Sequence, residues 1–201
     1  MLWSDAIVLH TCDTTYRFPL WHKLPPSVAN VQRYRLRINE RIGILCAFHL
    51  AVEPCYIRKT DFVLCIDENK GYKIIDVDRL NEKVNEIISN SNELLIFEGH
   101  LAHLCDGADK VFVLRVHPDI LRSRLEGRDY SESKIHENLE AEAMGVCTAE
   151  AYDIYGENVQ EIDVGELGIG EIIDLLEDAI FDRITFPVGE VDFMDWLITQ
   201  H

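Results

Sequence analysis

The chain has 201 residues, of which 47% are hydrophobic and 27% charged, a balance typical of a globular domain that can bury a sizeable core. Its formal net charge of −17 argues against non-specific binding to nucleic acids. The longest apolar run, 42–52, is too short for a spanning helix, and the first residues lack the basic region of a secretory signal. Six scattered cysteines without a C-x-x-C pair are typical of reduced thiols, so we expect a cytoplasmic protein without a zinc centre.

The charge divides the chain near residue 57. Residues 1–57 hold six Lys/Arg and four Asp/Glu, whereas residues 58–201 hold 13 and 32. The first segment is also rich in His, Trp and Cys and has weak hydrophobic periodicity. We therefore predict an atypical N-terminal segment of low order at 1–57, an α/β domain at 58–184 and a C-terminal tail at 185–201.

Hydrophobic periodicity from residue 62 onward predicts alternating strands and helices. The predicted strands are 62–66, 72–77, 94–97, 111–116 and 158–164. The predicted helices are 79–89, capped by Asp76 or Asp78, then 118–126, which opens with Pro118, 134–155 and 170–182. This alternation favours a parallel sheet with helical crossovers, in which ligands bind at the carboxyl ends of the strands.

The strand at 94–97 runs directly into Glu98-Gly99-His100. An apolar strand that ends in an acid has the form of a Walker B element, whose carboxylate helps to hold Mg²⁺ against nucleotide phosphates because this hard cation prefers oxygen ligands. Many strands end in Glu, so a solvated Glu98 at the sheet edge is the alternative. Arg115 lies at the end of the next strand, at the same edge of a parallel sheet.

A second group of charged residues lies between the predicted helices 118–126 and 134–155. Arg124, Arg128 and Lys134 surround a polar break at 127–133. A mobile loop that carries arginine can close over phosphates, exclude water and stabilise developing charge. A solvated helix-turn-helix with ordinary surface charges is the alternative.

Together, the runs EGHLAHL (98–104), VFVLRVHPDILRSRLEGRDYSESKIHENLEAEA (111–143) and NVQEIDV (158–164) resemble the adenylate kinase isoenzyme 6 family, and above all its archaeal branch. The resemblance covers about residues 60–182. It implies an α/β, P-loop nucleoside monophosphate kinase-like three-layer fold with a parallel sheet. It also implies adenylate kinase and ATPase activity with Mg²⁺ and ATP, with AMP as the acceptor. Finally, it implies a role in small ribosomal subunit maturation, through a small-subunit ribosomal protein or the pre-ribosome.

The resemblance also implies roles for individual residues. Glu98 matches the family's Walker B acid near Mg²⁺, directly or through water, and His100 matches the histidine that organises the catalytic water or the metal shell. Arg128 matches the arginine that contacts ATP from a lid, here at about 127–137. Arg115 and Lys134 are further candidates for contacts with the phosphates or the lid.

The family's phosphate-binding loop, G-x-x-x-x-G-K-[ST], does not occur upstream of the strand at 94–97. Gly43 is the only glycine in residues 1–61, and the stretch RIGI (41–44), which resembles the opening of the family's first strand, leads into LCAFH. Either the chain has diverged, or a reading-frame change has replaced its N-terminal segment. The composition change near residue 57 favours the second explanation.

Because the loop is missing, we expect weak phosphoryl transfer or none. The first alternative function is a non-catalytic ribosome-assembly binding module of the same fold. The second is a structural interaction protein that binds through its acidic surface.

Other polar and aromatic residues have simpler interpretations. The His and Cys residues of 1–57 match no zinc-ligand spacing. His100 and His103 are spaced three residues apart, as metal ligands can be, although a turn after the strand would direct His103 to solvent or to a neighbour. A solvated helix face is expected for Glu137, Glu140 and Glu142. The tail is expected to pack on the domain, with docking to a basic ribosomal protein as the alternative, through Phe186, Val188, Phe193, Trp196 and Leu197.

Overall fold

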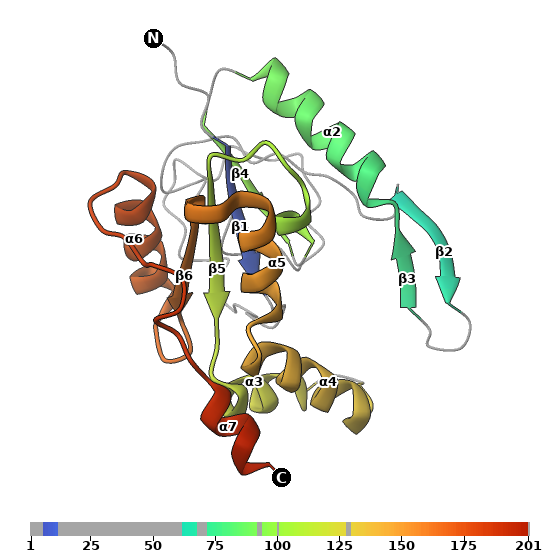
Figure 1. Ribbon diagram of the computed structural model, residues 1–201, viewed down its shortest axis with the longest axis vertical. Coiled ribbons are helices and arrows are strands. Elements are labelled where there is room, and N and C mark those ends of the chain that lie inside the picture. Colours follow the sequence, from blue (N-terminus) through green and yellow to red (C-terminus); the bar gives the residue numbers. More distant parts are fainter. Residues whose placement is uncertain are drawn as a thin grey trace, which may run out of the picture.

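A computed structural model describes residues 6–11, 62–67, 72–91, 94–99, 101–127 and 130–200 of the chain. Its main sheet has four parallel strands in the order β4-β1-β5-β6 (Figure 1). The strands are β1 Ala6–Thr11, β4 Leu95–Glu98, β5 Lys110–Arg115 and β6 Val159–Asp163. The helices are α2 Val77–Asn90, η3 Ala102–Leu104, α3 Pro118–Leu125, α4 Glu132–Ala143, α5 Val146–Tyr155, η4 Gly156–Asn158, α6 Ile169–Ile180 and α7 Met194–Thr199.

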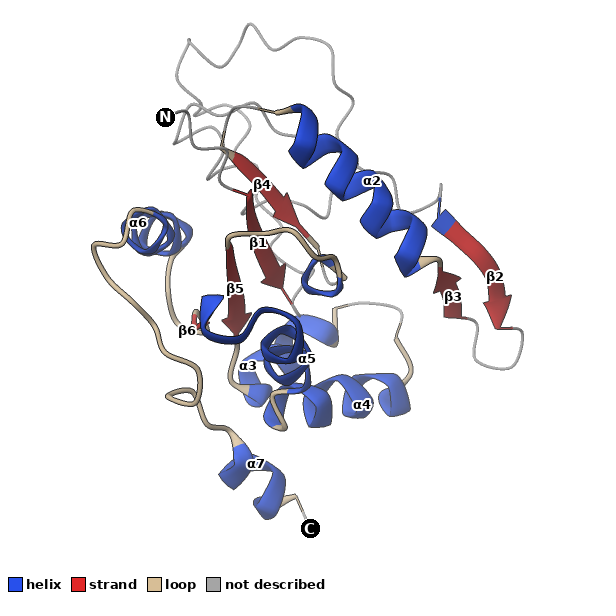
Figure 2. Cartoon of the chain, turned by 45° about the horizontal axis from the view of Figure 1, so that its top comes forward, coloured by secondary structure: helices blue, strands red, loops and turns tan. Residues whose placement is uncertain are grey.

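Helices cover both faces of the sheet (Figure 2). On β5, the alternating residues Val111 and Val113 belong to one core, which includes residues of α2 and α5. Phe112 and Leu114 belong to the core on the opposite face, with residues of α3, α4, α6 and α7. Strands of parallel sheets are continuous apolar runs because both of their faces are buried. The predicted three-layer α/β fold with a parallel sheet is therefore confirmed.

Between β1 and β4, the described residues form a hairpin and a helix. The predicted strands there form β2 (Val63–Asp67) and β3 (Tyr72–Ile75), which pair antiparallel in a sheet of their own. At the start of α2, the Asp76 side chain accepts a hydrogen bond from the Arg79 amide at 3.0 Å, which caps the helix as predicted. Leu80 and Val84, one turn apart, are buried in the core.

The single long helix predicted at 134–155 is wrong. The structure has two helices, α4 and α5, with Met144 and Gly145 between them. Gly145 has a φ of +63°, a left-handed conformation that glycine adopts without the steric cost of a Cβ atom. The backbone turns at this residue, so α5 leaves the direction of α4 and packs on the sheet.

The C-terminal tail packs on the domain, as predicted. Phe193 and Trp196 are buried in the core beside α3, α4 and α6, and Phe186 and Leu197 pack against the same core. The Trp196 indole also donates a hydrogen bond from Nε1 to Asp119 Oδ1 on α3 at 2.7 Å. The tail thereby attaches α7 to the helices at the carboxyl end of the sheet.

The low order expected for 1–57 is wrong for residues 6–11, because these residues form β1 between β4 and β5. The other residues of that segment lie outside the described ones. Within the described ranges, no helix is long and apolar enough to cross a membrane.

Candidate active site

The strand register identifies the edge of the sheet at which a ligand is expected. Leu9 of β1 lies beside Glu98 at the end of β4 and beside Phe112 of β5, and β1 ends two residues later at Thr11. The chain passes from β1 to β4 on one side and then to β5 on the other, so the strand order reverses at β1. Ligands of open α/β sheets bind outside the carboxyl ends of the strands at such a reversal.

The backbone of Glu98 lies at this edge, at the last residue of β4. Its side chain lies outside the described part of the structure, and so do His100 and Arg128. The predicted roles of these three residues remain predictions. The position of Glu98, next to the strand at which the order reverses, is nevertheless the one that a Mg²⁺-binding acid of a phosphoryl-transfer site requires.

The α3–α4 hairpin lies at the same edge, because α3 begins directly after the short connection that follows β5 (Figure 1). At the start of α4, the Ser131 side chain accepts a hydrogen bond from the Lys134 amide at 3.3 Å and caps the helix. The Lys134 ammonium lies 4.2 Å from the centre of the Tyr130 ring, in a cation–π contact. Arg122 pairs with Glu132 at 2.5 Å across the hairpin. These contacts hold the start of α4 within the predicted lid, and Lys134 lies on the first turn of α4.

Arg124, at the other side of the predicted lid, has a partner in the domain. Its Nη2 donates to the Gly165 carbonyl oxygen at 2.9 Å, which joins α3 to the connection between β6 and α6. This contact supports packing of α3 rather than exposure of the guanidinium at the edge of the lid.

Arg115 has a different environment from the predicted one. The guanidinium is 3% exposed, and its Nε donates to Glu142 Oε1 at 2.7 Å. Its Nη1 donates to Glu161 Oε1 on β6, and its Nη2 to the Glu142 carbonyl oxygen at 2.5 Å. Burial lowers the pKa of the Arg115 guanidinium, but the two carboxylates together raise it above its ordinary value. The structure therefore brings Arg115 to buried acids, and a contact between this residue and phosphate has no support here.

The expected solvated acidic face on α4 is wrong for Glu142, although Glu137 is exposed and Glu140 is partly exposed. Its side chain is 1% exposed, and Oε1 also accepts a hydrogen bond from the Val116 amide at 3.1 Å. Thr148 on α5 donates to Glu161 Oε1 at 2.8 Å. These buried polar groups join β5, β6, α4 and α5, and no local pattern in the sequence indicates that they lie together.

Comparison with known proteins adds the family. The AAA domain family AAA_18 matches residues 40–145. The protein named "putative adenylate kinase" from Methanothermobacter thermautotrophicus is 44% identical over 142 residues, which cover 71% of this chain and 81% of that protein. The protein of the same name from Archaeoglobus fulgidus is 41% identical over 133 residues, which cover 66% of this chain and 70% of that protein. The one from Pyrococcus furiosus is 39% identical over 141 residues, which cover 69% of this chain and 76% of that protein. The chain belongs to this adenylate kinase-like family.

Because the chain belongs to the adenylate kinase-like family, the segment after β1 is where a phosphate-binding loop is expected. A P-loop follows the central strand and wraps phosphates with backbone N–H groups, which requires glycines for close approach. The sequence after Thr11 continues as CDTTYRFPLW and contains no glycine before Gly43. The family match begins at residue 40, near the RIGI stretch, and there too LCAFH stands where glycines and lysine belong. Neither possible position for the loop has the residues that the family's chemistry needs.

Proposed function

We propose that the chain is an adenylate kinase-like protein that binds Mg²⁺ and ATP at the carboxyl end of β1 and β4 and transfers a phosphoryl group to AMP, or to water as an ATPase. In this proposal, Glu98 holds Mg²⁺, directly or through water, and His100 organises the attacking water or the metal shell. Arg128 and Lys134 contact ATP from the α3–α4 hairpin. The observation that carries the proposal is the position of Glu98 at the end of β4, beside the strand at which the order reverses.

The missing loop sets the expected rate. Phosphoryl transfer depends on positioning and charge stabilisation, and one preorganised donor contributes about 10²–10³-fold in rate. A chain without the glycine-rich loop and its lysine lacks several such donors. We therefore expect turnover that is several orders of magnitude slower than in a family member that has the phosphate-binding loop.

The missing phosphate-binding loop favours a second function, that of a non-catalytic binding module. This module would act in small ribosomal subunit maturation, in a cytoplasmic setting. Residues 58–201 carry 32 acidic and 13 basic residues, a charge that complements a basic small-subunit ribosomal protein or the pre-ribosome. A structural interaction protein that uses the same acidic surface without nucleotide is the third possibility.

The test measures ADP formation from ATP and AMP, and from ATP alone, with the purified chain at high concentration. Glu98→Ala is compared with Glu86→Ala, which removes an exposed carboxylate from the surface of α2. Turnover that disappears with Glu98→Ala and persists with Glu86→Ala supports the kinase proposal. ATP binding without turnover supports the binding module. No ATP binding at millimolar concentration overturns nucleotide use and leaves the interaction protein.

A further inference from the structure

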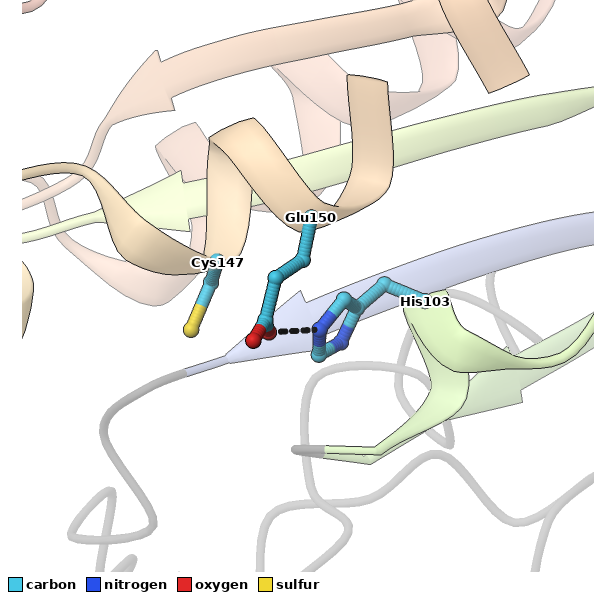
Figure 3. Close-up of side chains that lie close together, drawn as sticks. All are labelled: His103, Cys147 and Glu150. Atoms are coloured by element: carbon cyan, nitrogen blue, oxygen red, sulfur yellow. Dashed lines mark hydrogen bonds and ion pairs between the residues drawn. The ribbon is translucent and has the colours of Figure 1, made fainter. Parts of the chain in front are cut away.

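Three side chains with different donor atoms lie together beside the end of β1 (Figure 3). They are His103 on η3 and Cys147 and Glu150 on α5. A nitrogen of His103, the Cys147 sulfur and a carboxylate oxygen of Glu150 all lie within 4.8 Å of one another. None of these three residues has a role in the proposed nucleotide chemistry.

The fold brings these residues together from two elements. η3 follows closely after β4, so His103 lies just beyond the strand that ends in Glu98. Cys147 and Glu150 are three residues apart on α5, and residues at this spacing lie on the same face of a helix. His103 is 1% exposed and its Nε2 lies 2.9 Å from Glu150 Oε2, so the imidazole is held in place while it faces α5.

We propose that His103, Cys147 and Glu150 form a binding site for a divalent cation of the zinc class. Imidazole, thiolate and carboxylate are the three ligand types that Zn²⁺ takes, with bonds of about 2.0–2.3 Å. Mg²⁺ prefers all-oxygen octahedral sites, so this donor set selects against the cation of the nucleotide site. Three protein ligands leave the fourth tetrahedral position to water or to another group.

The geometry needs only a small change for metal to bind. Bonds of about 2.0–2.3 Å in a tetrahedron place the ligand atoms about 3.5 Å apart, closer than the present limit of 4.8 Å. The Glu150 side chain is 50% exposed and Cys147 is partly exposed, so both can rotate toward the fixed imidazole. The exposed carboxylate also lies open to solvent, from which a cation can enter.

Binding of the cation changes protons and connections in a defined way. Cys147 binds as thiolate, so its thiol proton passes to solvent when the cation binds. The cation replaces the His103–Glu150 hydrogen bond as the link between η3 and α5. Metal would therefore fix η3, which lies close in the chain to the proposed Mg²⁺-binding residue Glu98, and this effect does not depend on nucleotide turnover.

The test uses the full chain without an affinity tag, reduced and stripped of metal with a chelator. Zn²⁺ is titrated in competition with a chromophoric chelator, and Co²⁺ serves as a spectroscopic probe. One equivalent should bind, with a thiolate-to-cobalt charge-transfer band, and millimolar Mg²⁺ should not displace it. Zn²⁺ should also raise the thermal unfolding midpoint, since it binds the folded state.

Single substitutions decide whether these residues are the ligands. His103→Gln, Cys147→Ser and Glu150→Gln should each weaken Zn²⁺ binding by at least about 100-fold, since loss of a group that merely supports a ligand already costs about 10–100-fold. Asp153→Asn, on the exposed side of α5, and Cys105→Ala should leave the affinity unchanged. Unchanged affinity and charge-transfer band in Cys147→Ser would overturn the proposal and assign the metal to other cysteines. The partly exposed Cys147 makes this variant decisive even where His103→Gln fails to fold.

Discussion

Replacement of Arg115 by methionine tests whether the buried ion-pair network holds the carboxyl end of the sheet together. Methionine has a similar length and no charge, so the change removes the cation and leaves most of the apolar volume. Two carboxylates, those of Glu142 and Glu161, would then remain almost completely buried, at 1% and 2% exposure, without their cationic partner.

The magnitude follows from this burial. Removal of one partner of a buried ion pair costs about 3–5 kcal/mol, because it leaves an uncompensated charge in a medium of low polarity. Solvent screening does not reduce this cost, since the guanidinium is 3% exposed. In a chain of this size, 1 kcal/mol shifts the unfolding midpoint by about 2–4 °C, so Arg115→Met should lower it by about 6–20 °C.

The assay is thermal unfolding followed by circular dichroism, with urea unfolding as a second measurement. Arg183→Met is the matched control, because the Arg183 side chain is 54% exposed where it pairs with acids on α6, and its loss should change the midpoint little. A third chain, which combines Arg115→Met with Glu142→Gln and Glu161→Gln, should regain part of the lost stability. Equal midpoints for Arg115→Met and Arg183→Met would refute the assignment of a structural role to Arg115.

Three further predictions concern the elements around this network. In urea unfolding, Gly145→Ala should lower the free energy of unfolding by about 1–2 kcal/mol, because φ is +63° and a Cβ atom would lie 3.3 Å from Nη1 of Arg115. Gly170→Ala, at a position on α6 where a Cβ atom meets open space, should be neutral or stabilising in the same measurement. Trp196→Ala should cost about 3–5 kcal/mol and expose the tail to limited proteolysis, because it removes a buried indole and its hydrogen bond; a protease-resistant tail would contradict this. Burial raises the pKa of the Cys105 thiol from 9.0 to about 11. The contribution of this thiol to stability is therefore complete below pH 9 and is lost between pH 9 and 11. Urea midpoints measured over this range should fall more steeply for the native chain than for Cys105→Ala.

Local signals in the sequence predicted the elements that depend on nearby residues. The start of α2 follows from the cap at Asp76 and the apolar spacing of Leu80 and Val84, and α3 begins at Pro118 as its fixed φ favours. Such features involve residues within one or two turns of each other. They need no knowledge of what the element packs against.

Long-range partners explain the predictions that failed. Arg115 and Glu142 are 27 residues apart, and Arg115 and Glu161 are 46 apart, so nothing in the local pattern shows that these charges are buried together. The good helix formers of LEAEAM (139–144) before Gly145 and of AEA (149–151) after it offset the cost of about 1 kcal/mol that one glycine adds to a helix. The local pattern therefore predicts a continuous helix there. The Cys147–Glu150 spacing is visible in the sequence, but the approach of His103 to it depends on how α5 packs on the sheet.

The fold and the phosphate chemistry make separate demands on the central strand. Pairing with β4 and β5 uses backbone N–H and C=O groups, which any extended apolar segment offers, and AIVLHT is rich in residues that favour strands. Phosphate binding instead requires glycines and a lysine directly after the strand, and these are missing after Thr11 as they are after RIGI. A chain of this family can therefore complete its parallel sheet and position Glu98 without the loop, because the sheet does not depend on it. Retention of the fold therefore does not require turnover, and ADP formation in the enzyme assay separates the kinase from the binding module.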